Sequence, residues 1–347
     1  MPGSAAYAKL APAARVAKTL IPALERIRDA ASAADLQEAL TVLREYVPGL
    51  SEARRPGEVE EALYSWLGSL ALHLSKLAPE GAGDALLAFA LDDVALDMLA
   101  ILEAVESGSR PPRPATASIE WAPTALIARD PEAASSVDRV LDVAKPFKPL
   151  HRALSWAVEA ARAAREPRVY TLAHPAVSYI IYTQPLGGLD ADSARWVSRI
   201  VCPMLRHRAA RAAAQAVLQG LEPRVVAAAI PPIRDPYCRI PWGGLRELAE
   251  REVEEDQLLA GLRQLLPDQG LEGRSIVEAL EASYRRAREA VRAAALQAFE
   301  SYPLHLGLAV AALALARLSL ESMRAILTAK ALRLKPEQYI EALGVEA

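Results

Sequence analysis

The stretch YPLHLGLAVAALALARLSLESMRAILTAKALRLKPEQYIEALG, which spans Tyr302–Gly344, decides the predicted fold class. Its first part, 303–316, is almost purely apolar and stops at Arg317. Ser319 can cap a new helix, because its hydroxyl can accept hydrogen bonds from free backbone N–H groups, and apolar residues follow it near helical spacing. Pro336 suits a helix start, where proline is tolerated. The stretch therefore predicts three helices, at 303–317, 319–333 and 336–343.

Part of this stretch, SMRAIL at Ser322–Leu327, is echoed earlier in the chain. The clearest echo is DMLAIL at Asp97–Leu102, and a fainter one is RAAAQA at Arg211–Ala216. The three phrases begin at positions 97, 211 and 322, which are 114 and 111 residues apart. Such a period exceeds the roughly 20–50 residues of solenoid repeats. It predicts three copies of a small helical domain, at 1–115, 116–230 and 231–347.

Proline-rich breaks divide the chain in the same way. The segment SGSRPPRPATAS at 107–118 is the clearest predicted linker, and 223–244 is a second irregular zone. Most of the rest has the apolar periodicity of helices, including a helix at 190–220 that we expect Pro203 to interrupt. The segment 168–184, rich in β-branched and Tyr residues, fits a short strand pair or a buried helix equally well. The predicted fold class is all-α.

The bulk composition limits the classes of function. The chain has 347 residues, is 52% hydrophobic and carries a formal net charge of −3. It can bury a large core, and it lacks the basic excess of a general nucleic-acid binder. Its 33 Arg outnumber seven Lys, which a GC-rich genome or a thermophilic source would explain equally well.

The cysteines and the apolar runs bear on the cellular compartment. Cys202 and Cys238 do not form a CxxC pair, and two cysteines in so long a chain indicate an intracellular protein without a disulfide scaffold. Residues 1–18 lack the continuous apolar region of a signal peptide. The longest apolar run, 303–316, is shorter than the roughly 20 residues of a membrane span, so we expect a buried core helix there.

The sharpest enzyme-like motif is the acidic group Asp92, Asp93 and Asp97. Clustered aspartates on a helix can hold the Mg²⁺ that bridges a diphosphate, as in helical prenyl-diphosphate enzymes. Here the spacing before the third aspartate differs from theirs, and no second aspartate-rich helix follows. A helix surface beside a packed face is the favoured interpretation, and a magnesium-dependent enzyme is the alternative.

Other candidate sites are weaker. The five histidines have no metal-ligand spacing, and no nucleotide or nucleophile-elbow motif occurs. We therefore expect no cofactor, metal or catalytic residue. The basic run from Arg195 to Arg211 favours a solvated helix face over an anionic partner. For Arg324, a pair with Glu321 within one helix and an interface contact are equally consistent with the sequence.

Four segments together resemble a family of rotary-motor components, the C subunit of archaeal A-type ATP synthases and its counterpart in vacuolar-type ATPases, the d subunit. They are Tyr7–Leu10, Asp35–Leu36, the helix phrase Leu96–Leu99, and Glu321–Ile326, which resembles the C-terminal "Glu-x-x-Asn-Leu-Arg" phrase of the family. The chain departs from the family where its usual Asn is replaced by Asp97, Arg211 and Ser322 in the three copies.

The resemblance implies a funnel of three pseudo-repeated helical domains around a pseudo-threefold axis, with a central cavity. It implies a non-catalytic connector that couples the proteolipid rotor ring to the D and F subunits of the central stalk during ATP synthesis or proton transport. Such a protein would be peripheral to the cytoplasmic face of the cell membrane and would bind no nucleic acid. The resembling phrases contribute the candidate partner-interface residues Arg324, Glu321, Met323, Asp97 and Arg211.

Overall fold

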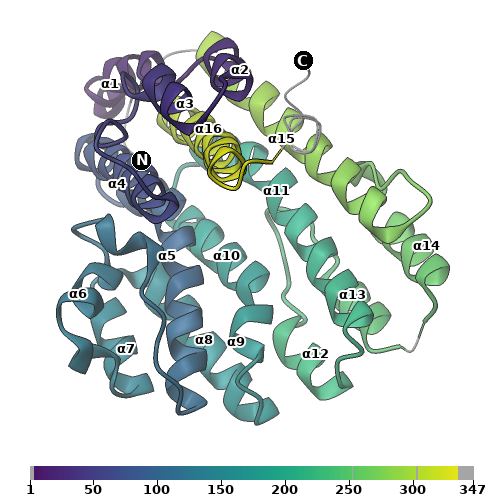
Figure 1. Cartoon of the computed structure of the whole chain (residues 1–347). Helices are drawn as coiled ribbons and strands as arrows, with labels where there is room; N and C mark the ends of the chain where they lie inside the picture. Colours follow the sequence, from purple (N-terminus) through teal and green to yellow (C-terminus); the bar gives the residue numbers. More distant parts are fainter. Residues whose placement is uncertain (1–3, 252, 302–303, 335–347) are drawn as a thin grey trace.

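The computed structural model of the chain describes residues 4–251, 253–301 and 304–334, and over these ranges the fold is all-α. Every regular element in them is an α-helix or a short 3₁₀-helix, as Figure 1 shows. The predicted fold class is therefore confirmed. No helix in the described ranges combines the length and the apolarity that crossing a membrane requires.

The elements fall into a first and a second half of the chain. The first half contains η1 (Ser4–Tyr7), α1 (Leu10–Thr19), α2 (Leu24–Ser32), α3 (Leu36–Leu43), α4 (Pro56–Leu77), α5 (Gly83–Glu106), η2 (Ala115–Ser118), α6 (Pro123–Arg129), η3 (Pro131–Ala134), α7 (Val137–Ala144) and α8 (Lys148–Ala164). The second half contains α9 (Val169–Leu172), α10 (His174–Thr183), η4 (Gln184–Gly188), α11 (Ala191–Leu218), α12 (Pro223–Ala229), α13 (Trp242–Ala249), α14 (Glu255–Leu265), η5 (Pro267–Gln269), α15 (Ile276–Glu300) and α16 (Gly307–Ala331).

Six helices form a closed circuit of contacts. In chain order, α4 packs on α5, α5 on α10, α10 on α11, α11 on α15 and α15 on α16, and α16 returns to pack on α4. Three of these contacts join helices that follow each other directly or through one short 3₁₀ turn, namely α4–α5, α10–α11 and α15–α16. The second helices of these pairs begin at residues 83, 191 and 307.

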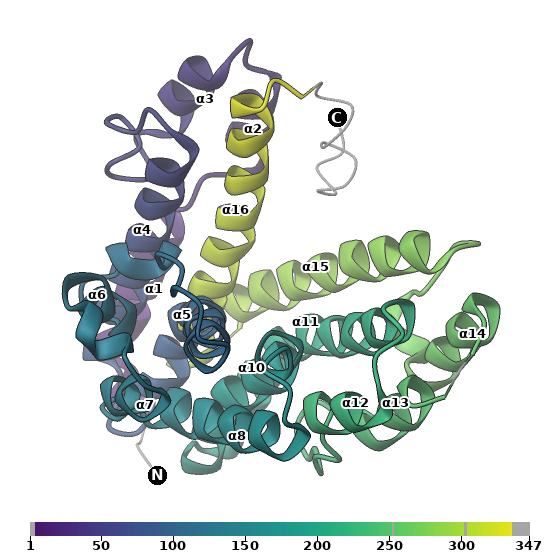
Figure 2. The same ribbon diagram turned by 60° about the horizontal axis from the view of Figure 1, so that its bottom comes forward.

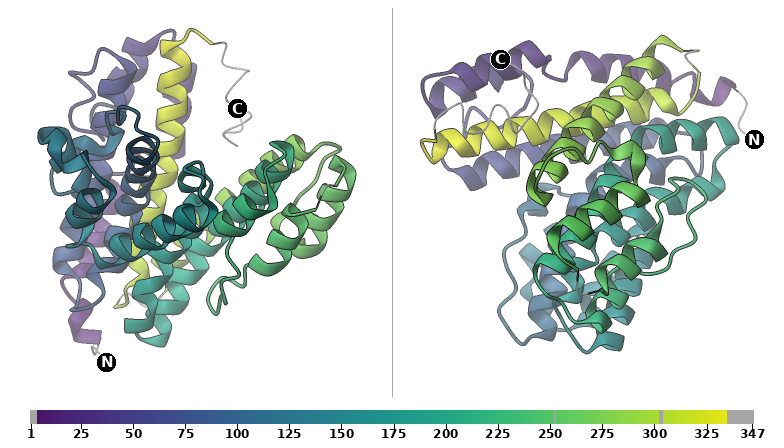
Figure 3. Two further views of the ribbon diagram at one scale, coloured as in Figure 1. Left: turned by 90° about the horizontal axis from the view of Figure 1, so that it is seen from below. Right: turned by 90° about the vertical axis from the view of Figure 1, so that its right-hand side faces the viewer.

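Some of the remaining helices extend the circuit into two arms. Figure 2 shows α16 with α2, α3 and α4 in one arm, and α15 with α11, α13 and α14 in the other. The arms diverge from the corner where α15 and α16 meet, and Figure 3 shows the same divergence from below. A groove of about 340 Å³ lies near that corner, between the α1–α2 turn at Ile21, Leu296 of α15 and Leu315 of α16.

The larger of the two hydrophobic core clusters in the described residues runs through all parts of the fold. Its buried members extend from Tyr7 to Leu327 and come from all three thirds of the sequence. The first helices of the chain pack on the last one, since α1, α2 and α3 all contact α16. The three proposed repeats therefore share buried surface, and their boundaries remain a prediction.

Two predicted helix breaks were wrong. α16 runs without interruption from Gly307 to Ala331, and Ser319, the predicted cap, is buried within it. Arg317 does not end the helix, because acidic partners on α5 compensate its charge. α11 likewise continues through Pro203. The third helix predicted for this stretch, at 336–343, lies outside the described residues.

The segment 168–184 is helical, which excludes the strand-pair alternative. α9 and α10 occupy it, and α10 buries Val177, Ile181 and Tyr182 against α5, α8 and α11. Tertiary burial of these apolar side chains outweighs their intrinsic preference for strands.

The predicted linker at 107–118 is only partly a free connection. Its end forms η2, which packs on α4, and Thr116 is buried there. The Asp97 carboxylate accepts hydrogen bonds from both the backbone N–H and the hydroxyl of Thr116, each at 2.7 Å. The proline-rich segment is thus anchored to the helix that precedes it.

The expectation that the cysteines form no disulfide was wrong, because Cys202 and Cys238 are joined by one. The bond joins α11 to the loop before α13, across a sequence separation of 36 residues. Both cysteines are buried. Sequence spacing alone did not indicate that the two would be neighbours in the fold.

Replacing Cys202 and Cys238 together with Ala should lower the free energy of unfolding by about 3–4 kcal/mol, the chain-entropy value for a loop of this size. Guanidinium unfolding of the oxidised protein and of the variant measures the difference. Wild-type protein kept in reductant serves as the control and should resemble the variant. Identical unfolding midpoints for all three samples would contradict the prediction.

Candidate functional site

A buried cluster of charged side chains lies where α5, α11 and α16 meet. Asp92 and Asp93 come from α5, Arg208 from α11 and Arg317 from α16. Arg208 Nη1 lies 2.7 Å from Asp92 Oδ2, and Arg317 Nη2 lies 3.0 Å from the same oxygen. Both terminal nitrogens of Arg317 also contact Asp93, each at 2.9 Å. Three helices far apart in sequence are thus joined through one carboxylate pair.

Asp92 is the centre of this cluster. Its side chain is 0% exposed, and it accepts a hydrogen bond of 2.5 Å from the hydroxyl of Ser178 on α10. His174 Nε2 lies 3.5 Å from its Oδ1. Burial by itself raises the pKa of Asp92, but the Arg208 and Arg317 guanidinium groups hold that pKa well below its usual range. Asp92 is therefore an ionised carboxylate in the core.

The cluster continues along α16 to α15. Glu321 lies 3.5 Å from Arg317 Nε and 2.7 Å from Arg288 Nη1. Arg288 also donates to the hydroxyl of Ser322 at 2.7 Å, and the hydroxyl of Tyr284 donates to Glu321 at 3.0 Å. The network thereby links α5, α11, α15 and α16, with three carboxylates facing three guanidinium groups.

A small cavity adjoins the network. Its volume is about 30 Å³, and Arg208, Arg317 and Glu321 form its polar part beside apolar residues such as Phe89 and Tyr182. A water molecule needs about 10–15 Å³ of such volume, so the cavity has room for about two waters and is too small for an organic substrate. The arrangement can hold helices together electrostatically.

The metal hypothesis for the aspartate group loses its ligands in this geometry. Arg208 and Arg317 occupy Oδ2 of Asp92, and Ser178 occupies its Oδ1. Arg317 contacts both oxygens of Asp93, while Thr116 donates two hydrogen bonds to Oδ2 of Asp97. No group of His, Cys, Asp or Glu in the described part of the chain has a metal-binding arrangement. The favoured expectation of a helix surface was wrong for Asp92, which is fully buried.

The five predicted interface residues do not form one site. Asp97 anchors η2 through Thr116, whereas Arg211 is exposed on α11. Met323 is fully buried, which removes it from the accessible surface. Glu321 belongs to the buried network. These positions therefore serve different structural roles, and their part in binding a partner stays a prediction.

For Arg324, the pair with Glu321 within one helix was wrong, and the interface contact stays a prediction. Its side chain is 48% exposed, and its Nε lies 3.0 Å from Glu60 on α4. Its Nη1 donates to the hydroxyl of Tyr64 at 2.8 Å. Arg324 thus connects α16 to α4, and Glu321 points to Arg288 and Arg317 instead of forming the predicted pair with Arg324.

Sequence reasoning missed the partners that neutralise the aspartates. Arg208 was assigned to a solvated basic face, yet its side chain is 17% exposed and pairs with Asp92. Arg195 and Arg199 of the same run are exposed, as expected for that face. One usable signal was Arg317, a lone cation at the end of an apolar run, because a charge buried on a core helix requires an opposite charge.

Comparison with known proteins gives no family for this chain. No protein-family model matches the sequence, and no curated protein matches it significantly.

The substitution Arg317→Met should lower the free energy of unfolding by about 3–5 kcal/mol, because it leaves Asp92 and Asp93 buried with one guanidinium fewer. Chemical denaturation followed by circular dichroism measures the loss. The matched control is Arg324→Met on the same helix, where a half-exposed pair should contribute about 1 kcal/mol or less. Equal losses of unfolding free energy in the two variants would contradict the prediction that the buried ion pairs contribute more than the half-exposed pair.

The depressed pKa of Asp92 predicts an acid-sensitive stability. A carboxylate whose pKa is lower in the folded than in the unfolded protein stabilises the fold above its unfolded pKa of about 3.9, and that stabilisation is lost as the pH falls further. Below about pH 4 the free energy of unfolding of the wild type should therefore fall more steeply than that of Asp92→Asn, by up to about 1.4 kcal/mol per pH unit. Parallel pH profiles would refute this role of Asp92.

Proposed function

We propose that this chain is the non-catalytic central-stalk connector of a rotary A-type or V-type ATPase, coupling a proteolipid ring to the D and F subunits. The observation that carries the proposal is the closed circuit of six helices locked by a buried, charge-balanced network. A part that transmits torque needs stiffness, and close-packed interiors deform little.

The positions of the repeated phrases support a threefold organisation. Asp97–Leu102 lies on α5, Arg211–Ala216 on α11 and Ser322–Leu327 on α16, so each phrase falls on the second helix of one pair in the circuit. These helices begin 108 and 116 residues apart, at 83, 191 and 307, close to the spacing of the phrases. We propose that the three helix pairs are related by a pseudo-threefold axis through the charged cluster.

The socket for the D and F shaft would be the space between the two arms. The cavity at the helix junction holds about 30 Å³ and cannot admit a protein segment. The groove of about 340 Å³ near the corner of the arms is wider, with apolar walls and the cations Lys18 and Arg292. We propose that this groove is the floor of a funnel whose other end rests on the proteolipid ring at the cytoplasmic face of the membrane.

The disulfide is compatible with this location. Intracellular disulfides are rare in mesophiles but are frequent in hyperthermophilic archaea. The Arg-rich, Lys-poor composition has a thermophilic source as one explanation. The disulfide and the Arg-rich composition are therefore both compatible with an archaeal rotary ATPase. The alternative of a magnesium-dependent prenyl-diphosphate enzyme has less support, because Arg208 and Arg317 occupy the aspartates that it would need.

Co-purification tests the proposal directly. The full chain, tagged and expressed in its native cells, should bring down the proteolipid, D and F subunits after mild detergent extraction. Mass spectrometry identifies the captured subunits. Capture of none of these by a folded, monodisperse protein would overturn the proposal. Thermal stabilisation by magnesium together with a prenyl diphosphate would favour the enzyme alternative.

The charge reversal Arg324→Glu should weaken capture of the ring or of the stalk at least severalfold, because it places like charges at the exposed junction of α16 with Glu60 on α4. Quantitative pull-down measures the loss, after circular dichroism establishes that the variant is folded. The control is Arg152→Glu, an exposed position on α8 outside both arms. Undiminished capture of both partners by folded Arg324→Glu would exclude this residue from the interface.

A further inference from the structure

A second hollow lies on the outer face of α11, beside the disulfide. It is a groove of about 600 Å³ between α11 and the loop around Tyr237. Four arginines line it, and none of the described residues in its lining is acidic. The four are Arg195, Arg199, Arg206 and Arg239. The lining of the groove is therefore positively charged, although the chain as a whole carries a formal net charge of −3.

Three of the arginines form a row along one helix. Arg195 and Arg199 are four residues apart, and Arg206 follows seven residues later, so all three project from the same side of α11. With a rise of 1.5 Å per residue, the row extends over roughly 16 Å. A single phosphate ion cannot contact the whole row, whereas a linear chain of phosphates can.

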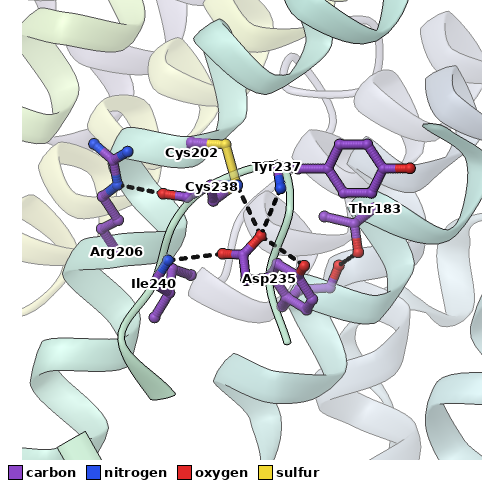
Figure 4. The surroundings of a disulfide bond; sticks show 8 residues. Thr183, Cys202, Arg206, Asp235, Tyr237, Cys238 and Ile240 are labelled. Carbon is purple, nitrogen blue, oxygen red and sulfur yellow. Dashed lines mark hydrogen bonds between the residues drawn. A yellow bond between two sulfur atoms is a disulfide. The ribbon is translucent and has the colours of Figure 1, made fainter. Parts of the chain in front are cut away.

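Arg206 is held in position by the loop opposite. Its Nε donates a hydrogen bond of 2.7 Å to the carbonyl oxygen of Cys238. Figure 4 shows this bond, with the two terminal nitrogens of Arg206 on the side away from that carbonyl. The guanidinium group is therefore oriented before any ligand arrives, which lowers the ordering cost of binding.

Hydrogen bonds and the disulfide fix the conformation of the loop at 235–240. One carboxylate, that of Asp235, accepts hydrogen bonds from the backbone N–H groups of Tyr237, Cys238 and Ile240, as Figure 4 shows. The disulfide ties Cys238 to Cys202 on α11. Between these constraints Arg239 has a φ of 56°, in the left-handed region that non-glycine residues seldom adopt. The surrounding bonds thus hold the fourth arginine in an unusual conformation at the rim of the groove.

The protein's own acids compete little with a ligand. Asp192 pairs with Arg195 at 3.3 Å, but both side chains are about three-quarters exposed, so this pair is weak. Arg199 lies over the ring of Trp196, with its guanidinium carbon 5.6 Å from the ring centre. Stacking of this kind leaves the edges of a guanidinium group free to donate hydrogen bonds.

We propose that this groove binds a soluble linear oligophosphate, a ligand with two or more phosphate groups in a row. Arginine forks donate pairs of hydrogen bonds to phosphate oxygens, and the concave shape suits an extended anion better than a flat membrane surface. The proposal is independent of the rotary connector, since no residue of the groove belongs to the charged cluster or to the space between the arms.

Isothermal titration of the full chain with sodium tripolyphosphate tests the proposal. The wild type should show saturable binding that weakens as salt is raised, and inorganic monophosphate should bind at least tenfold more weakly. Arg199→Gln and Arg239→Gln should each lower the affinity about tenfold, because each removes a charged hydrogen-bond donor. Arg211→Gln is the matched control, since Arg211 is exposed on the same helix but does not line the groove.

Three results would overturn the proposal. The first is the absence of saturable tripolyphosphate binding to the oxidised wild type at low salt. The second is an equal loss of affinity in Arg211→Gln and Arg199→Gln, which would indicate a general charge effect. The third is binding to anionic phospholipid vesicles that Arg199→Gln and Arg239→Gln weaken but that free tripolyphosphate does not displace, which would identify a membrane headgroup as the ligand of the groove. Because Arg199 and Arg239 are exposed, neither substitution should impair folding.

Discussion

The ion pairs of Asp92 with Arg208 and Arg317 are the interaction on which the arrangement of the long helices depends. A carboxylate that is 0% exposed would be strongly destabilising without compensation. Its two guanidinium partners come from α11 and α16, so the charge is compensated only when both helices bring an arginine within reach of α5. Burial of this acid thus disfavours other helix registers, since a shifted register would leave a buried charge without a partner.

The network explains why the charged residues do not disturb the apolar core around them. Asp92, Asp93 and Glu321 face Arg208, Arg317 and Arg288, so the junction is close to neutral overall. The hydroxyls of Ser178 and Ser322 complete its hydrogen bonds. Such a junction is suited to holding helices in a constant relation, which is the mechanical property that the proposed connector requires. The arginines of the outer groove differ, because no acid lines that groove among the described residues.

Local sequence rules predicted helices and breaks correctly where neighbouring residues alone determine the backbone conformation. The proline-rich segment 107–118, predicted as a linker, does separate α5 from α6 and contains only the short η2. The same rules were wrong at Pro203 and Ser319, where helices continue because packing on both sides favours the helix more than the local signal opposes it. In α10, burial of Ile181 and Tyr182 outweighed a strand-like composition in the same way.

The sequence by itself determined that the chain is helical, because apolar periodicity is a local property of the chain. Only the tertiary structure decided which charges meet. Asp92 and Arg208 are separated by 116 residues, and Asp93 and Arg317 by 224, so no local pattern joins them. The pairing of Cys202 with Cys238 and the gathering of Arg239 with the arginines of α11 were decided in the same way. The physical reason is that such contacts depend on how whole helices pack, which is a property of the complete core.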